Sequence, residues 1–383
     1  MMPTATEPTA LWVFWAIAIT RFLLPLTIPK YPLPGILASL ILDAVDQTIF
    51  QQFPSLNLEG YQGYDKALDI YYLTIAYIST LRNWENHFAF RISRFLFYWR
   101  LIGVALFELT HLRPLLLIFP NTFEYFFIFY EAYRLRWEPK RMSKKLAIGA
   151  AVAIWIVIKL PQEYWIHIAQ TDTTDWIKTS LFKVPVDTPW SLIFQTWTWV
   201  FLCGFAVLAI VLVAVGWLIK KRTPPADYRL GFSSDAHRER FTSAQVRRAF
   251  AIEDKEVLDA ALLEKVVLIA LVSLTFAQVI PGVYSSDLQL VLGISLVVVI
   301  NGFVSQWLAR RRFGWVFTVQ QIAVVAALNL ALILGYALVR SMFENPLRIV
   351  NVLFFSLLLT LLVGLYDRYR LIYLMRFGMH VAE

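Results

Sequence analysis

Residues 199–219 read WVFLCGFAVLAIVLVAVGWLI, a run of 21 residues that contains no charged side chain. A helix needs about 20 apolar residues to cross the hydrocarbon core of a bilayer, which is about 30 Å thick. This run therefore predicts a transmembrane helix within residues 191–219. The full set of candidate spans comprises 11–28, 34–51, 66–83, 92–110, 113–133, 146–162, 191–219, 262–281, 287–308, 316–339 and 348–366. The sequence thus predicts an all-α, polytopic transmembrane bundle of about ten to eleven helices.

The overall composition agrees with this fold class. Apolar residues make up 58% of the 383-residue chain and charged residues only 16%. Soluble domains carry about 45–50% apolar and about 25% charged residues. The apolar excess implies a surface that faces lipid. Cys203 is the single cysteine, which excludes an internal disulfide and a cysteine metal cluster.

The basic residues indicate how the chain is oriented in the bilayer. The formal net charge is +8, and Lys and Arg gather in segments 134–145, 220–248, 310–312 and 368–376. Cytoplasmic loops are enriched in Lys and Arg, so these segments predict an outside N-terminus and a cytoplasmic C-terminus. We expect an integral protein of the plasma membrane. Because the basic residues lie between apolar runs, an anionic leaflet rather than nucleic acid is their expected partner.

The chain divides into three regions by composition. Residues 1–219 form an aromatic-rich region of about seven helices that is dotted with charges, and residues 262–383 form an apolar four-helix region with a basic tail. Between them, residues 220–261 form a basic cytoplasmic loop, and 243–265 has the pattern of an amphipathic helix. Beyond the lipid bilayer, a second copy or a partner protein is expected to bind at the last four helices or at this loop.

Charged residues within the apolar runs are the strongest functional signal. A charge inside a membrane costs about 2.5–3.5 kcal/mol on insertion scales, so it usually faces a cavity or an opposite charge. Asp43 and Asp46 share one helix face at spacing i, i+3. We expect the acids of 34–51, 66–83 and 113–133 to neutralise the arginines of 92–110, with Glu124 near the middle of its helix. The candidate substrate- or ion-binding residues are Asp43, Asp46, Asp69, Arg100, Glu124 and Glu131.

Three function classes remain open at this point. Paired acids inside a membrane favour a secondary transporter or an ion-conducting protein with a polar site in the first helices. A membrane-embedded enzyme acting on a lipid or isoprenoid is the second class, and a non-catalytic assembly or scaffold protein is the third. His167 and Asp172 match the short HxxxxD acyltransferase motif, which can arise by chance. P-loop, HExxH and GxSxG motifs are absent from the sequence, and it identifies no cofactor, metal ligand or catalytic residue.

Overall fold

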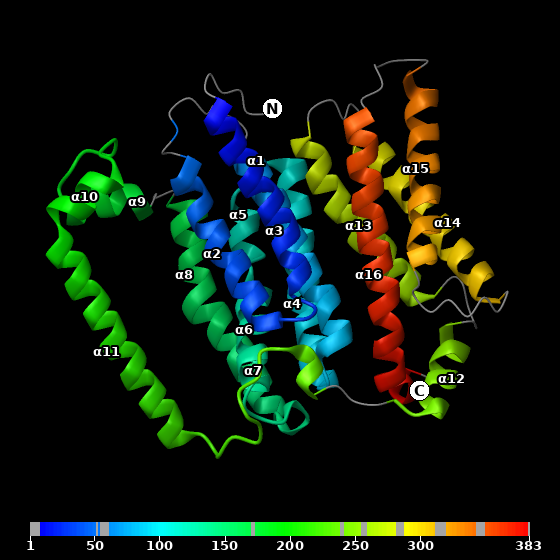
Figure 1. Ribbon diagram of the computed structural model, residues 1–383, viewed down its shortest axis with the longest axis horizontal. Coiled ribbons are helices and arrows are strands. Elements are labelled where there is room, and N and C mark those ends of the chain that lie inside the picture. The colour runs from blue at the N-terminus through cyan, green and yellow to red at the C-terminus, as the bar shows by residue number, and fades with distance from the viewer. Residues whose placement is uncertain are drawn as a thin grey trace.

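The computed structural model describes residues 8–50, 53, 61–169, 173–237, 241–253, 259–280, 287–310, 319–341 and 349–381. Within these ranges every regular element is a helix, which confirms the predicted all-α class (Figure 1). Six helices are long and apolar enough to cross a bilayer, and they indicate a membrane-embedded protein. These six are Thr9–Thr27, Pro32–Phe50, Lys144–Ile168, Thr198–Leu218, Ala260–Val279 and Ile349–Gly378.

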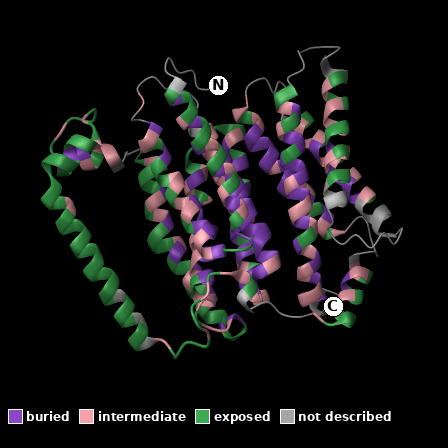
Figure 2. Ribbon diagram, in the orientation of Figure 1, coloured by how far each residue is buried: buried purple, intermediate pink, exposed green. Residues whose placement is uncertain are grey.

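The first four helices run up and down beside one another (Figure 1). They are α1 (Pro8–Leu23, continued by η1, Leu24–Thr27), α2 (Pro32–Phe50), α3 (Tyr61–Asn83) and α4 (His87–Thr110). Helix α3 is the centre of the fold, because it packs against α2 and α4 on one side and against α13 and α16 on the other. Its residues from Ala67 to Leu81 are almost all buried, as the purple ribbon at the middle of Figure 2 shows.

The predicted span 113–133 is wrong as a single helix. It consists of α5 (Pro114–Ile118) and α6 (Thr122–Arg134), separated by an unwound Phe119–Pro120–Asn121. Pro120 has no N–H group and pushes the residue before it out of the helical region, and Phe119 accordingly has φ −113° and ψ 64°. Helix α4 makes room for the break with Gly103, since a Cβ there would lie 2.1 Å from the Cβ of Phe119.

The next two spans also differ from the prediction in detail. The span predicted at 146–162 extends over Lys144–Ile168, through α7 (Lys144–Ala153), η3 (Ile154–Lys159), α8 (Leu160–Glu163) and η4 (Tyr164–Ile168). Both η3 and η4 are π-helical, and they flank Pro161, which cannot donate to the carbonyl one turn earlier. Short helices α9 (Thr173–Trp176), η5 (Ile177–Leu181) and α10 (Trp190–Thr196) lead to α11 (Thr198–Arg222), which stands apart from the other helices in Figure 1.

The second half contains η6 (Ser234–His237), α12 (Ser243–Glu253), α13 (Ala260–Val279), α14 (Asp287–Arg310), α15 (Val319–Ser341) and α16 (Ile349–Val381). The predicted amphipathic helix 243–265 is wrong in extent, because Asp259 is extended and caps the start of α13, to which Lys265 belongs. Helix α12 packs against α16 through Ala249, Leu371 and Leu374. The arginines of the predicted basic tail lie within α16, which continues to Val381.

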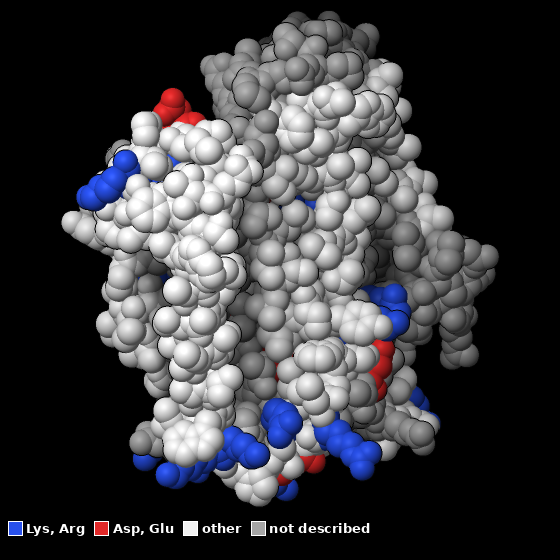
Figure 3. All heavy atoms as spheres, turned by 60° about the vertical axis from the view of Figure 1, so that its left-hand side comes forward, with Lys and Arg blue, Asp and Glu red and all other residues white. Residues whose placement is uncertain are grey.

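Several connecting segments meet at one end of the helices. The N–H of Ser234 donates to the carbonyl of Lys30 at 2.9 Å, and the N–H of Asp227 donates to that of Arg136 at 2.8 Å. Arg376 of α16 donates to a carbonyl directly after α3 at 2.6 Å. We call this the basic end, because Lys and Arg gather at the lower end of the face in Figure 3. Residues 281–286 and 311–318, which also bear on the predicted orientation, lie outside the described residues.

Candidate functional site

One arginine forms salt bridges with four carboxylates of two other helices. The guanidinium of Arg21, near the end of α1, bonds to Asp43 and Asp46 of α2, to Asp65 of α3 at 2.8 Å and to Asp69 of α3 at 3.0 Å. Arg21 is 5% exposed and Asp46 is fully buried. The sequence places each pair of acids on one face of its helix, because their spacing is i, i+3 on α2 and i, i+4 on α3. We call these five residues the Arg21 cluster.

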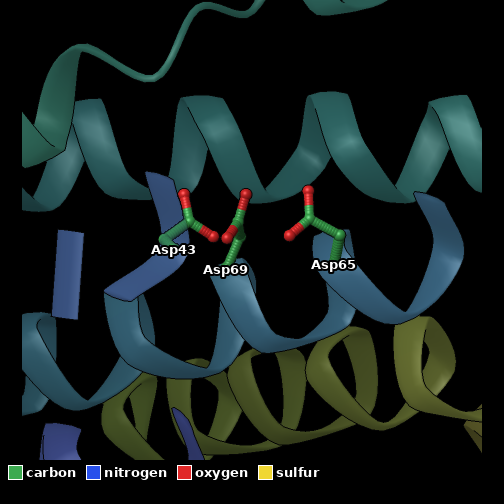
Figure 4. Close-up of side chains that lie close together, drawn as sticks. All are labelled: Asp43, Asp65 and Asp69. Carbon is green, nitrogen blue, oxygen red and sulfur yellow. The ribbon is translucent and has the colours of Figure 1, made fainter. Parts of the chain in front are cut away.

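The charges of the Arg21 cluster do not balance within it. Four carboxylates share a single guanidinium, and like charges this close repel one another in a partly buried site. The excess negative charge is removed only if carboxyl groups take up protons or a cation binds. Asp43, Asp65 and Asp69 each offer a carboxylate oxygen within 4.8 Å of the others, and Figure 4 shows the three side chains side by side. These three residues could hold a hard cation through oxygen ligands.

A second polar group lies at the break between α5 and α6. Glu124 is in the first turn of α6, not at mid-helix, and it is 2% exposed. Its carboxylate accepts from the hydroxyl of Tyr72 at 2.5 Å and from the side-chain amide of Asn121 at 2.9 Å. The ammonium of Lys159 lies 3.6 Å away. Three other segments thus supply the polar contacts of Glu124.

A second carboxylate reaches the break from α8. Glu163 of α8 accepts from the backbone N–H of Asn121 at 3.0 Å and lies 3.7 Å from Arg100 of α4. His167 lies one turn further along the same span, with its Nε2 3.0 Å from Glu163. Asp172, the second residue of the HxxxxD match, lies outside the described residues. Arg100, Asn121, Glu124, Lys159 and Glu163 are together called the break network.

Tyr72 connects the break network with the Arg21 cluster. It follows Asp69 by three residues on α3, so both side chains lie on the same face one turn apart. Counted from the start of α3 at 1.5 Å per residue, Asp65 lies about 6 Å and Asp69 about 12 Å along the helix. Helix α3 starts opposite the basic end. Polar groups therefore reach from that opposite end to the middle of the bundle.

Aromatic rings fill the bundle between the break and the basic end. Phe123 lies one residue after Thr122, the first residue of α6, and its ring centroid is 5.4 Å from that of Phe97 and 6.0 Å from that of Phe127. Tyr77 stacks on Phe97 at 4.4 Å. Nearer the basic end, the ring of Trp84 lies 5.8 Å from Phe127 and 3.8 Å from Tyr130. All six rings are at most 1% exposed. We call them the aromatic seal.

The pairing that the sequence predicted for α4 is wrong. Arg94 pairs with Glu264 of α13 at 3.0 Å, and Arg100 faces Glu163 of α8, so acids of α2, α3 and α6 do not neutralise the arginines of α4. The reason is geometric: Arg21 is close enough to occupy the acids of α2 and α3 itself. Glu131 lies apart from Glu124, where it accepts from Trp84 Nε1 at 2.8 Å and pairs with Arg134 at 3.0 Å.

Sequence reasoning missed Arg21, Asp65, Tyr72, Lys159 and Glu163 as site residues. A signal existed for two of them, since Arg21 and Lys159 are lone basic residues inside otherwise apolar runs. Of the residues that the sequence predicted, Asp43, Asp46 and Asp69 lie together in the Arg21 cluster. Arg100 and Glu124 belong to the break network. No family model, curated protein sequence or solved structure matches this chain.

Proposed function

We propose that this chain is a secondary transporter of the plasma membrane, in which the Arg21 cluster binds and releases the coupling proton or cation. The observation that carries the proposal is the sharing of one guanidinium by four carboxylates. Such a site needs added positive charge, and the side chains of Asp43, Asp65 and Asp69 are 22%, 32% and 27% exposed, so that charge can come and go.

The position of the aromatic seal favours a transporter over an open channel. Polar groups extend inward from the end opposite the basic end, and the buried rings close the path beyond Phe123. A channel needs a continuous polar path, whereas a transporter opens a central site to one side at a time. With the basic end in the cytoplasm, as the positive-inside rule requires, the polar half faces outward and the N-terminus lies outside.

Ion flux into proteoliposomes tests this proposal. A pH-sensitive dye inside the vesicles reports proton movement when a pH gradient, or a gradient of Na⁺ or K⁺, is applied. We expect the wild-type protein to couple the two gradients and Asp69→Asn to abolish the coupling. Asp367→Asn is the matched control, because Asp367 pairs with Lys265 in the second half of the chain, and it should retain the coupling.

The same assay separates the competing function classes. A folded wild-type protein that couples none of these gradients would favour a scaffold in which the buried charges only fix the packing of helices. Equal coupling in Asp69→Asn and the wild type would remove the Arg21 cluster from the mechanism.

A further inference from the structure

The break between α5 and α6 is supported by side chains of neighbouring helices. The carbonyl of Ile118 accepts from Trp99 Nε1 at 3.0 Å, and the carbonyl of Phe119 accepts from Arg100 Nη1 at 3.1 Å. The N–H of Asn121 donates to Glu163. Non-helical backbone inside a membrane protein persists only where such partners satisfy it or where it lines a polar site. Side chains of neighbouring helices therefore stabilise the non-helical backbone at the break.

Within the described part of the chain, three buried polar atoms at the break have no hydrogen-bond partner. They are Asn121 Oδ1, Thr122 Oγ1 and Arg100 Nε. Asn121 is 8% exposed and Thr122 is 1% exposed. The Asn121 carboxamide lies over the first turn of α6, because its Nδ2 donates to Glu124. A buried polar group without a partner costs about 1–3 kcal/mol, so these atoms point to a ligand that completes them.

The N-terminus of α6 adds hydrogen-bond donors at the same place. The first N–H groups of a helix have no partner within it. The N–H of Thr122 donates to the carbonyl of Pro120 at 2.8 Å, whereas among the described residues the N-cap Asn121 makes no side-chain capping bond to the N–H groups that follow. Thr122, Phe123 and Glu124 are all buried. A helix N-terminus favours an anionic group, and the guanidinium of Arg100 favours the same charge. The acidic end of a ligand therefore fits here.

The charges of the break network restrict the ligand further. Arg100 and Lys159 supply two positive charges, and Glu124 and Glu163 supply two negative charges, so the network is balanced without a ligand. A ligand with net charge would leave one charge uncompensated inside the membrane, which is costly. The ligand must also donate to Asn121 Oδ1 while it accepts from Arg100 Nε. A zwitterion with adjacent carboxylate and ammonium groups meets all of these conditions.

We propose that the break binds a small α-amino acid as the transported substrate. Its carboxylate lies at the N-terminus of α6 and accepts from Arg100 Nε and from the hydroxyl of Thr122, and its ammonium donates to Asn121 Oδ1. We expect a small side chain, because Phe119 packs against Gly103 and Phe123 lies one residue beyond Thr122. The inference rests on the proposed transport function, since Tyr72, one turn from Asp69 on α3, donates to Glu124 of the break network.

Thr122→Val provides the decisive variant. The hydroxyl of Thr122 has no partner among the described residues, so its removal should leave the melting temperature of the ligand-free protein unchanged or raise it. The same change removes a donor to the ligand and should weaken binding about tenfold, which corresponds to about 1.4 kcal/mol. Thr360→Val is the matched control: it removes the acceptor for Asn329 Nδ2, so it should lower the melting temperature and leave binding unchanged.

Binding is measured by thermal shift and calorimetry on the purified full-length protein, with glycine, L-alanine, L-serine and L-phenylalanine as probes. Acetate and methylamine, each with one of the two charged groups, serve as comparison ligands. We expect the small amino acids to bind, with neither comparison ligand binding, and Thr122→Val to bind them weakly.

The outcomes separate this inference from the proposed function. If no amino acid binds, or if acetate alone binds, the site is not an amino-acid site, whereas ion coupling that depends on Asp69 would still support the transporter. If Thr122→Val binds amino acids as well as the wild type, the break is not where they bind. If ion coupling is also absent, the transporter proposal fails independently.

Discussion

Replacing Arg21 by leucine tests the physical basis of the Arg21 cluster. The substitution keeps an apolar stem on α1 but leaves four carboxylates without their shared cation, one of them on the fully buried Asp46. Breaking one buried ion pair by removing a partner costs about 3–5 kcal/mol. We expect a loss of folding stability at least within that range at neutral pH. The loss should shrink at acidic pH, where protonation of the carboxyl groups removes the uncompensated charge.

Thermal unfolding in detergent at two pH values measures this effect. Arg91→Leu is the matched control, since Arg91 lies exposed on α4, and it should change stability little. Adding Asp46→Asn to the Arg21→Leu variant should restore part of the lost stability. Equal melting temperatures for the Arg21 and Arg91 variants, or a loss that does not depend on pH, would refute the reasoning that the carboxylates depend on Arg21.

The remaining predictions concern the break, its acid and the orientation of the chain. Gly103→Ala should destabilise the protein by about 1–3 kcal/mol in thermal unfolding, because its Cβ would overlap the side chain at the break, whereas Gly204→Ala, whose Cβ meets nothing within 4 Å, should not. Glu124→Gln should abolish transport per folded molecule in proteoliposomes; full activity would exclude this carboxylate from the mechanism. In a cysteine-free background, a cysteine at Thr173 should react with an impermeant reagent outside intact cells and one at Ser234 should not, and the reverse result would invert the topology.

The sequence was most informative where a single helix is sufficient to decide the outcome. The span predicted at 262–281 is observed as Ala260–Val279, and most of the other described spans begin or end within a few residues of the prediction. Apolar length is a property of one helix in lipid and needs no knowledge of its neighbours. The prediction was wrong at 113–133 because apolar length alone does not reveal a break, and Pro120 interrupts the backbone hydrogen bonds within that run.

The candidate acids were also visible in the sequence, but their partners were not. Spacing placed Asp43 and Asp46 on one face of α2, and the structure keeps them together on Arg21. Their assignment to the arginines of α4 was wrong because spacing does not tell which helix that face meets. Glu124 shows the same limit, since Tyr72, Asn121 and Lys159 reach it from three different segments.

The sequence by itself determined the helical class, apolar helices long enough to cross a membrane, and the segments in which Lys and Arg gather, because hydrophobicity and charge act on each segment independently. Only the tertiary structure decided which charges meet, that a guanidinium of α1 serves four acids of α2 and α3, and that the rings of the aromatic seal pack together in the core. Those features depend on the rotation and neighbours of each helix, which packing of the whole bundle sets through contacts between residues far apart in the chain.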